Sequence, residues 1–207
     1  GYRIPSSRLD VAAFRRDLNT QLLTKTGGAK TANYIRGVKW PIISVADDAF
    51  PGMKAEEAEK LVGEAALAVR PEFRGYYTKS QLKAGDVRKD DLERKYLNSY
   101  SPHGGSYVMI LPAPFLIGTS DTKYRNDTDH SMPFSYDTHV PLLFYGFPFQ
   151  AGIYRGKAEP VDLAVTLASL LGINQPSHAV GRVLTEALAP ARPAASGDNE
   201  RPRERTQ

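Results

Sequence analysis

The first half of the chain carries apolar residues at helical spacing. One group opens the pattern: Val11, Phe14, Leu18 and Leu22. This spacing predicts an amphipathic helix, which Gly27 ends. Ser7 stands three residues before the carboxylate of Asp10, an arrangement typical of a capping box, so we expect the helix to begin there.

Further patterns extend this helical half. An Ala- and Glu-rich run over 54–69 places apolar residues on one face: Ala58, Leu61, Val62, Ala65 and Val69. Capping residues predict a short helix over 78–82 and another from 90 or 91 toward 100. Residues 34–45 alternate loosely and are rich in Ile and Val. They predict a strand, which Pro41 would confine to a sheet edge or a bulge.

The second half is richer in strand patterns. Residues 107–111 and 140–145 are nearly continuous apolar runs, which predict strands covered on both faces, as in an α/β sheet. A helix is predicted over 160–171, and Gly172 follows it. One predicted helix is too few to cover both faces of these strands, and much of their apolar surface would stay exposed. We therefore expect the strand half to be completed by more chain.

The patterns predict an α/β protein with three parts. Residues 1–103 form a mostly helical segment, and residues 104–189 form a strand-rich segment of a larger sheet. Residues 190–207 have the composition of a disordered tail.

Composition narrows the chemistry and the partners. The 207 residues include no cysteine, which excludes disulfides and thiolate metal sites and leaves His, Asp and Glu as strong metal ligands. The net charge of +4 comes partly from arginines in the last stretch, without a compact basic stripe, so we expect no nucleic-acid partner. No apolar run approaches the roughly 18 residues of a membrane span, so we expect no membrane partner.

Polar residues able to do chemistry are densest between residues 121 and 139. The group comprises Asp121, Asp127, Asp129, His130, Tyr136, Asp137 and His139. Imidazole and carboxylate suit zinc, and the group precedes a predicted buried strand, where active-site residues often lie. Spacing alone leaves a second interpretation open, in which the histidines are ordinary loop residues and the aspartates form turns.

The order of residues in this stretch resembles a known family. Residues 129–141 read Asp-His-Ser-Met-Pro-Phe-Ser-Tyr-Asp-Thr-His-Val-Pro, and an apolar run and Gly146 follow. This is similar to the His-Gly-Ser-Pro-Tyr-x-Tyr-Asp-Thr-His-Val-Pro segment of bacterial alkaline phosphatases of the phosphodiesterase-like branch. Downstream, residues 160–173 and 181–184 resemble that family's next helix and closing strand. Residues 8–100 resemble, more loosely, the segment before the metal loop.

The resemblance implies a fold and a site. The fold would be the C-terminal part of an alkaline-phosphatase-like three-layer sandwich with a helical inserted subdomain. The first histidine of the motif is a zinc ligand in the family, so His130 is the implied ligand here, with Asp137 or His139 orienting its ring. The full-length enzyme would hold a pair of zinc ions, hydrolyse small-molecule phosphate esters, and lie in the periplasm or be secreted.

Departures from the family pattern keep other functions open. Ser131 stands where the family has Gly, Phe134 replaces Tyr, and Val165 replaces Pro. The family's nucleophile and remaining metal ligands have no counterpart in this chain, so we expect no catalytic residue in it and no activity from it alone. The alternatives are a sulfatase- or phosphonate-hydrolase-like member and a degenerate, non-catalytic domain. The sequence does not indicate an oligomeric state.

Overall fold

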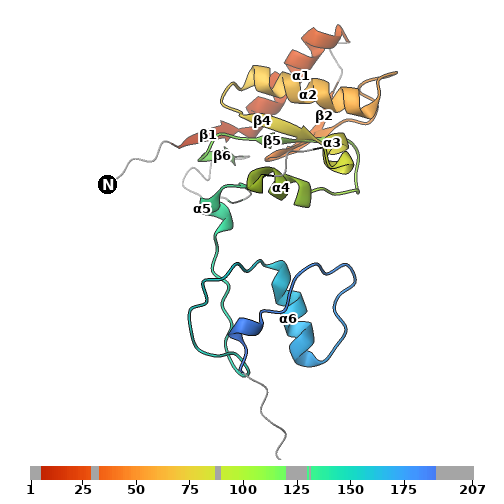
Figure 1. Ribbon diagram of the computed structural model, residues 1–207. Helices are drawn as coiled ribbons and strands as arrows, with labels where there is room; N and C mark the ends of the chain where they lie inside the picture. The colour runs from red at the N-terminus through yellow and green to blue at the C-terminus, as the bar shows by residue number, and fades with distance from the viewer. Residues whose placement is uncertain (1–5, 29–32, 87–89, 120–129, 131, 190–207) are drawn as a thin grey trace, which may run out of the picture. The chain divides into compact units, whose positions relative to one another are not determined.

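The computed structural model describes residues 6–28, 33–86, 90–119, 130 and 132–189. The chain divides into two compact units, residues 1–139 and residues 140–207. The first contains these elements (Figure 1): β1 (Ser7–Asp10), α1 (Val11–Thr26), β2 (Ile35–Lys39), β3 (Ile42–Val45), α2 (Ala55–Val69), β4 (Gly75–Thr78), α3 (Lys79–Ala84), α4 (Asp91–Asn98), β5 (Tyr107–Leu111), β6 (Leu116–Thr119) and α5 (Ser135–Thr138). The second contains α6 (Val161–Leu171) and the 3-10 helix η2 (Thr185–Ala187).

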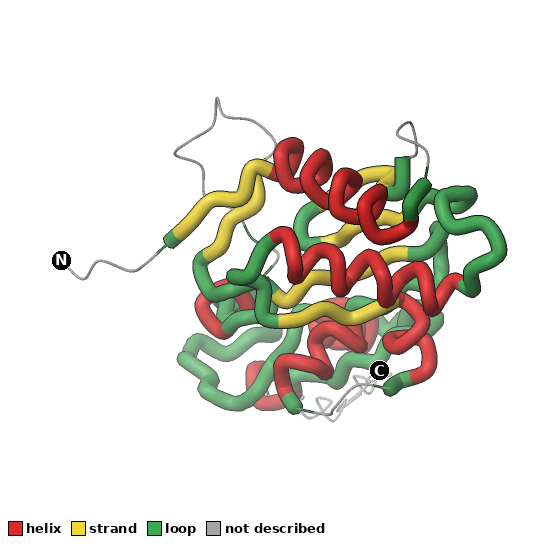
Figure 2. Tube along the Cα trace, turned by 90° about the horizontal axis from the view of Figure 1, so that it is seen from above, coloured by secondary structure: helices red, strands yellow, loops and turns green. Residues whose placement is uncertain are grey.

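A four-stranded antiparallel sheet organises the first unit. Its order is β2-β3-β5-β4, with α1 and α2 on one face and α3 and α4 on the other (Figures 1 and 2). Val108 and Ile110 of β5 join the cluster under α1 and α2, whereas Tyr107 and Met109 pack with α3 and α4. Helices therefore cover β5 on both faces, as its continuous apolar run predicts. The mixed α/β class predicted from the sequence is confirmed.

The first helix forms as predicted, but its N-cap lies three residues after Ser7. Asp10 is its N-cap, and its Oδ1 accepts the N–H of Ala13 at 2.8 Å. Gly27 ends the helix in the left-handed region at φ 64°, which glycine adopts without steric cost. Ser7 lies instead in β1, which pairs in parallel with β6. This long-range pairing takes the residues that local capping rules would assign to the helix start.

The single strand predicted over 34–45 is wrong in its continuity. Two antiparallel strands, β2 and β3, occupy the segment, and Pro41 lies in the turn between them after a cis Trp40–Pro41 bond. Since proline lacks an N–H, the turn is the place in this hairpin where it costs no ladder bond. β3 then lies inside the sheet between β2 and β5.

The other predicted helices of the first unit are confirmed. Residues Ala55–Val69 form α2, and Val62, Ala65 and Ala66 lie in the core. Thr78 caps α3 through the N–H of Gln81, and Asp90 caps α4 through the N–H of Glu93. These caps are local in sequence, which is why capping rules identify them.

The second unit departs from two strand predictions. Helix α6 forms where expected and Gly172 ends it, but residues 140–145 form no strand. Leu143 and Tyr145 are 86% and 102% exposed. No described segment pairs with this run, so its backbone lacks the partner that a strand requires. Residues 181–184 are likewise not a strand, and side chains of α6 hold them instead.

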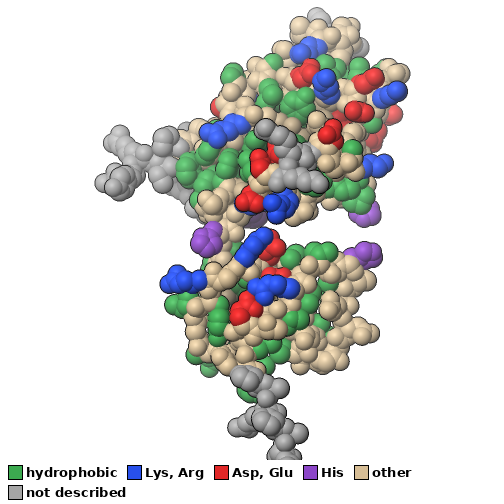
Figure 3. Space-filling model, in the orientation of Figure 1, with side chains coloured by type: hydrophobic (Ala, Val, Ile, Leu, Met, Phe, Trp, Pro, Cys, Tyr) green, Lys and Arg blue, Asp and Glu red, His purple; other side chains and the backbone are tan. Residues whose placement is uncertain are grey.

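Exposed apolar side chains are concentrated in the second unit. Its buried apolar residues are Val165, Ala168, Leu184 and Ala187. Apolar side chains appear at its surface in Figure 3, and its exposed members are Val140, Leu143, Tyr145, Phe147, Ile153, Tyr154, Val161, Leu163, Leu167, Leu171, Ile173 and Val180. A helix that is apolar on two faces is typical of the interior of a larger protein.

The division of the chain into two compact units falls after residue 139, and β5 and β6 lie in the first unit. The boundary expected at residue 104 separates an inserted segment from the core of a longer fold, so it stays a prediction. The predicted tail, residues 190–207, lies outside the described residues. Within the described chain, no helix is long and apolar enough to cross a bilayer.

Candidate functional site

The candidate metal ligand, His130, lies just before a short segment formed by residues 132–139, which contains α5. His130 is exposed, and Phe134 is the N-cap of α5. The backbone N–H groups of Asp137 and Thr138 both donate to the carbonyl of Phe134, at 2.9 and 3.0 Å. A turn of only four residues is too short to be stable by its own hydrogen bonds, so contacts from elsewhere must hold it.

Asp137 closes this segment on itself. Its Oδ2 accepts the backbone N–H of Met132 at 2.6 Å. A charged acceptor makes a stronger hydrogen bond to an N–H than a neutral one does. The contact joins α5 to a residue two positions after His130, so Asp137 holds the backbone at Met132. Its predicted contact with the His130 ring stays a prediction.

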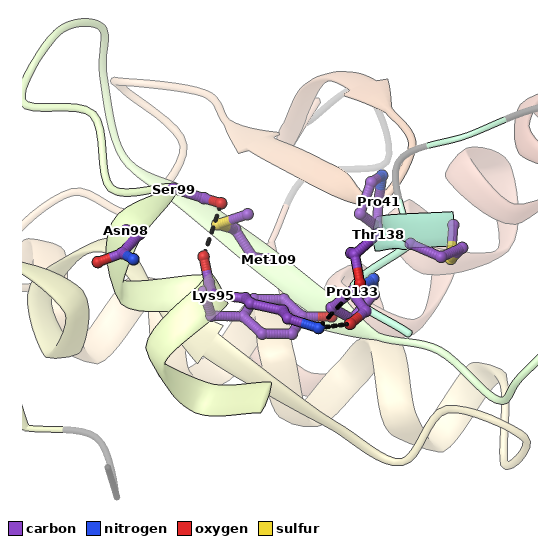
Figure 4. Close-up of a pocket in the computed structure, with 9 residues that line it drawn as sticks. Pro41, Lys95, Asn98, Ser99, Met109, Pro133 and Thr138 are labelled. Carbon is purple, nitrogen blue, oxygen red and sulfur yellow. Dashed lines mark hydrogen bonds between the residues drawn. The ribbon is translucent and has the colours of Figure 1, made fainter. Parts of the chain in front are cut away.

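Lys95 of α4 reaches both ends of the same segment. Its Nζ donates to the carbonyl of Pro133 at 2.8 Å and to Oγ1 of Thr138 at 3.1 Å (Figure 4). The segment borders an open pocket of about 360 Å³. The lining comprises Pro41, Lys95, Tyr96, Asn98, Ser99, Met109, Met132, Pro133 and Thr138. Polar contacts therefore link the segment to α4 at the edge of this pocket.

An aromatic stack fixes the outer side of α5. The Tyr136 ring lies between Phe115 and Phe134, with ring centroids 4.4 and 5.6 Å away. The Tyr136 hydroxyl accepts the backbone N–H of Phe115 at 2.9 Å. Phe115 has φ 61°, a conformation that non-glycine residues seldom adopt and that needs support from its surroundings.

His139 ends α5 and does not open a strand. It is exposed, and its backbone N–H donates to the carbonyl of Ser135 at 2.9 Å. The role predicted for its ring beside His130 stays a prediction. Three aspartates of the candidate group, Asp121, Asp127 and Asp129, lie outside the described residues, as does Ser131.

The donor set fits one position of a zinc site. The His130 imidazole belongs to an exposed residue and offers a nitrogen that zinc accepts. Among the described residues, no group of three or more His, Asp or Glu side chains is placed to hold a metal ion. A complete zinc site would need further ligands from outside this part of the chain.

Comparisons with known proteins extend this picture. No protein-family model matches the chain. A calcium-transporting ATPase of Myroides odoratus is 27% identical over 188 residues, covering 88% of this chain and 32% of that protein. Alkaline phosphatase PafA of Elizabethkingia meningoseptica is 25% identical over 195 residues, covering 78% of this chain and 35% of that protein.

A solved structure shares the fold. The crystal structure of wild-type alkaline phosphatase PafA matches 90% of this chain with a TM-score of 0.73 and 21% identity. In sequence and in fold the chain is similar to the alkaline phosphatase superfamily. It spans about a third of the length of these superfamily relatives, 35% by sequence and 34% by structure. The resemblance stated from residues 129–146 is thereby confirmed at the level of the superfamily.

The sequence did not reveal two residues that hold the segment, Lys95 and Phe115. Lys95 lies 38 and 43 residues from its two acceptors, and Phe115 lies 21 residues from Tyr136. No local spacing pattern signals such contacts. The Tyr-Asp pair at 136 and 137 was visible as polar chemistry, but its role in holding the loop needed the tertiary structure.

Proposed function

We propose that this chain is part of a zinc-dependent hydrolase of small-molecule phosphate esters, and that His130 is one ligand of its metal site. The observation that carries the proposal is His130, an exposed residue beside a segment held by Asp137 and Lys95, in a chain similar to the alkaline phosphatase superfamily. A histidine ligand needs a fixed backbone, because metal affinity depends on ligand orientation.

The proposal assigns chemistry to few residues of this chain. Bound zinc would stabilise negative charge on the phosphate ester as a Lewis acid. His130 would donate its imidazole nitrogen, and Asp137 would keep the backbone at Met132 in place. The remaining ligands and the nucleophile would come from a longer polypeptide. A periplasmic or secreted location is part of the same proposal and follows from the resemblance alone.

The bare apolar face of the second unit supports a larger parent protein. Residues 140–145 have the composition of a doubly covered strand, and yet Leu143 and Tyr145 are exposed. Leu163, Leu167 and Leu171 repeat every four residues on α6 and are also exposed. Such surface is costly in water, at roughly 25 cal/mol for each Å². Further sheet and helix layers of an α/β core would cover it.

The ligand assignment is tested by zinc titration of this chain, followed through the histidine ring signals in NMR spectra. The His130 signals should shift, and His130→Ala should remove the response. His178→Ala is the matched control, since His178 is an exposed histidine of the second unit. A zinc response that survives in His130→Ala and disappears in His178→Ala would contradict the assignment.

Activity provides the second test. The chain alone should show no zinc-dependent hydrolysis of an aryl phosphate, because one histidine does not make a catalytic zinc site. In a longer polypeptide that contains this chain, His130→Ala should lower zinc content and rate together. An unchanged zinc content in that variant counts against His130 as a ligand.

A further inference from the structure

Helix α4 is firmly attached to the sheet. The hydroxyl of Tyr96 donates to the carbonyl of Ile110 in β5 at 3.0 Å, and both residues are buried. The Tyr96 ring packs on Tyr77 with centroids 4.8 Å apart, and the hydroxyl of Tyr77 donates to Oε1 of Glu93 at 3.2 Å. The backbone of the intervening Lys95 is therefore fixed relative to β5.

The Lys95 side chain points away from β5 toward the segment around α5. One ammonium group bonds Pro133 at the start of the segment and Thr138 at its end. Its two acceptors are five residues apart, so a single side chain fixes the length and direction of the segment between them. His130 lies three residues before the first acceptor, and His139 directly follows the second.

An open pocket of about 360 Å³ lies on this side of the segment. Met132 and Pro133 line it together with Pro41 and Met109. Side chains that line an open pocket have fewer close contacts across it than side chains in a filled core. Charge-assisted hydrogen bonds are the stronger kind, and Lys95 supplies two of them here.

We propose that Lys95 is a positioning residue that holds the His130 loop to the sheet through α4. The proposal rests on the proposed function for its link to zinc, but its structural part does not. Lys95 does not touch the metal. It holds Pro133 and Thr138 to α4, and through α4 to β5, so that the segment next to His130 is ordered before zinc binds. The ordering of the loop then belongs to the fold of the first unit and not to the metal.

Hydrogen exchange of the metal-free chain tests the structural part. The amides of Asp137, Thr138 and His139 should exchange about tenfold faster in Lys95→Met, because a lost charge-assisted hydrogen bond has an effect of this order. Lys95→Arg keeps the charge and donors and should restore much of the protection. Arg94→Met is the control, since Arg94 lies next along α4 and pairs only with the exposed Asp91 among the residues described.

The outcomes separate clearly. Faster exchange confined to 132–139, with α1 and β5 unchanged, supports the proposal. Equal acceleration in α1, α2 and β5 would mean that Lys95→Met destabilises the whole unit, and unchanged exchange at 137–139 would mean that Lys95 does not hold the loop. Either result overturns the proposal.

Zinc titration of the same variants tests the link to function. Lys95→Met should require at least about threefold more zinc to shift the His130 ring signals, since positioning contacts outside the ligand set affect metal affinity. If zinc does not shift the His130 ring signals of the wild-type chain, the proposed function is contradicted. The hydrogen-exchange result still decides whether Lys95 holds the loop. A normal zinc response in Lys95→Met contradicts the positioning role alone.

Discussion

Asp162 and Arg182 lie 20 residues apart in sequence, and Oδ1 of the aspartate accepts the backbone N–H of Arg182 at 2.8 Å. The other oxygen, Oδ2, accepts the N–H of Glu159 at 2.8 Å. The carboxylate is buried, at 5% exposure. It joins the start of α6 to residues 181–184, the segment that resembles the family's closing strand. Thr166 adds a parallel contact by accepting the N–H of Leu184 at 3.0 Å.

Asp162→Asn should destabilise the second unit. The asparagine side chain keeps one acceptor oxygen and has an NH₂ group in place of the other. This NH₂ donor would face the N–H of either Glu159 or Arg182, which would then lack an acceptor. We expect a loss of about 1–3 kcal/mol in the free energy of unfolding, the range for an unsatisfied buried group. Chemical denaturation followed by circular dichroism of the whole chain measures it. Thr166→Val should act in the same direction, and no loss in either variant would contradict the role of these contacts.

Acid should destabilise the wild-type chain through the same carboxylate. The N–H groups of Arg182 and Glu159 lower the pKa of Asp162 below its ordinary 3.8, although burial opposes them. A lowered pKa stabilises the fold above the unfolded value, and this stability is lost as pH falls toward the folded value. We expect the free energy of unfolding to decrease below about pH 4 and to depend less on pH in Asp162→Asn.

Glu186 provides the control for this pH dependence. The guanidinium of Arg182 lowers the pKa of Glu186 to about 2, with the two groups in an exposed pair. Both carboxylates therefore shift stability in the same direction. Glu186→Gln should leave most of the acid dependence in place, because solvent screens exposed pairs. If Glu186→Gln removes it and Asp162→Asn does not, Asp162 is not its source.

Asp137→Ala should loosen the loop at one point. The Met132 amide loses its charged acceptor, so its hydrogen exchange should become about tenfold faster. Lys95 remains in place, and the amides of α1 should be unaffected. Exchange measured by NMR at Met132 provides the test, with Asp91→Ala as a control at an exposed aspartate of α4. Unchanged exchange at Met132 would show that the contact is not maintained in solution.

Lys79→Met should destabilise the first unit. Nζ of Lys79 donates to the carbonyls of Pro102, Gly104 and Gly105 at 3.2, 2.8 and 3.3 Å. The ammonium also lies 5.6 Å from the centroid of the Tyr107 ring. Removing these contacts should cost about 1–2 kcal/mol, since the site is partly exposed. Denaturation of Lys79→Met is compared with that of Lys83→Met, an exposed lysine of the same helix. Equal stability of the two variants would contradict this prediction.

Substitutions at two positions on α6 should differ in their effect on stability. Val165 is buried at 2% exposure, and Leu167 is 39% exposed. Val165→Ala should lower the free energy of unfolding by about 2 kcal/mol through the cavity that it leaves. Leu167→Glu should change it by less than about 0.5 kcal/mol in this chain. In a longer polypeptide that covers this face, Leu167→Glu should become destabilising, and failure to do so would argue against the proposed covering layers.

Local patterns predicted the helices of this protein well. The start of α3 at Thr78 and that of α4 at Asp90 are set by side chains that bond N–H groups three residues away. Such contacts need no distant partner, so capping rules identify them. The same rules misplaced the start of α1, because pairing of Ser7 with Leu116 competes with the helix for these residues. The strand predicted over 140–145 is wrong because no described segment pairs with it, and an apolar run forms a strand only where a pairing partner exists.

The sequence by itself determined most of the helices, the α/β class and the resemblance to the alkaline phosphatase superfamily, because periodicity, caps and the order of residues 129–146 are all local. Only the tertiary structure decided how the segment after His130 is held. Lys95 and Phe115 contact this segment from 21 to 43 residues away, and the fold of the first unit brings them to it. A hydrogen bond between distant residues depends on where the whole backbone places donor and acceptor, and no spacing along the chain encodes it.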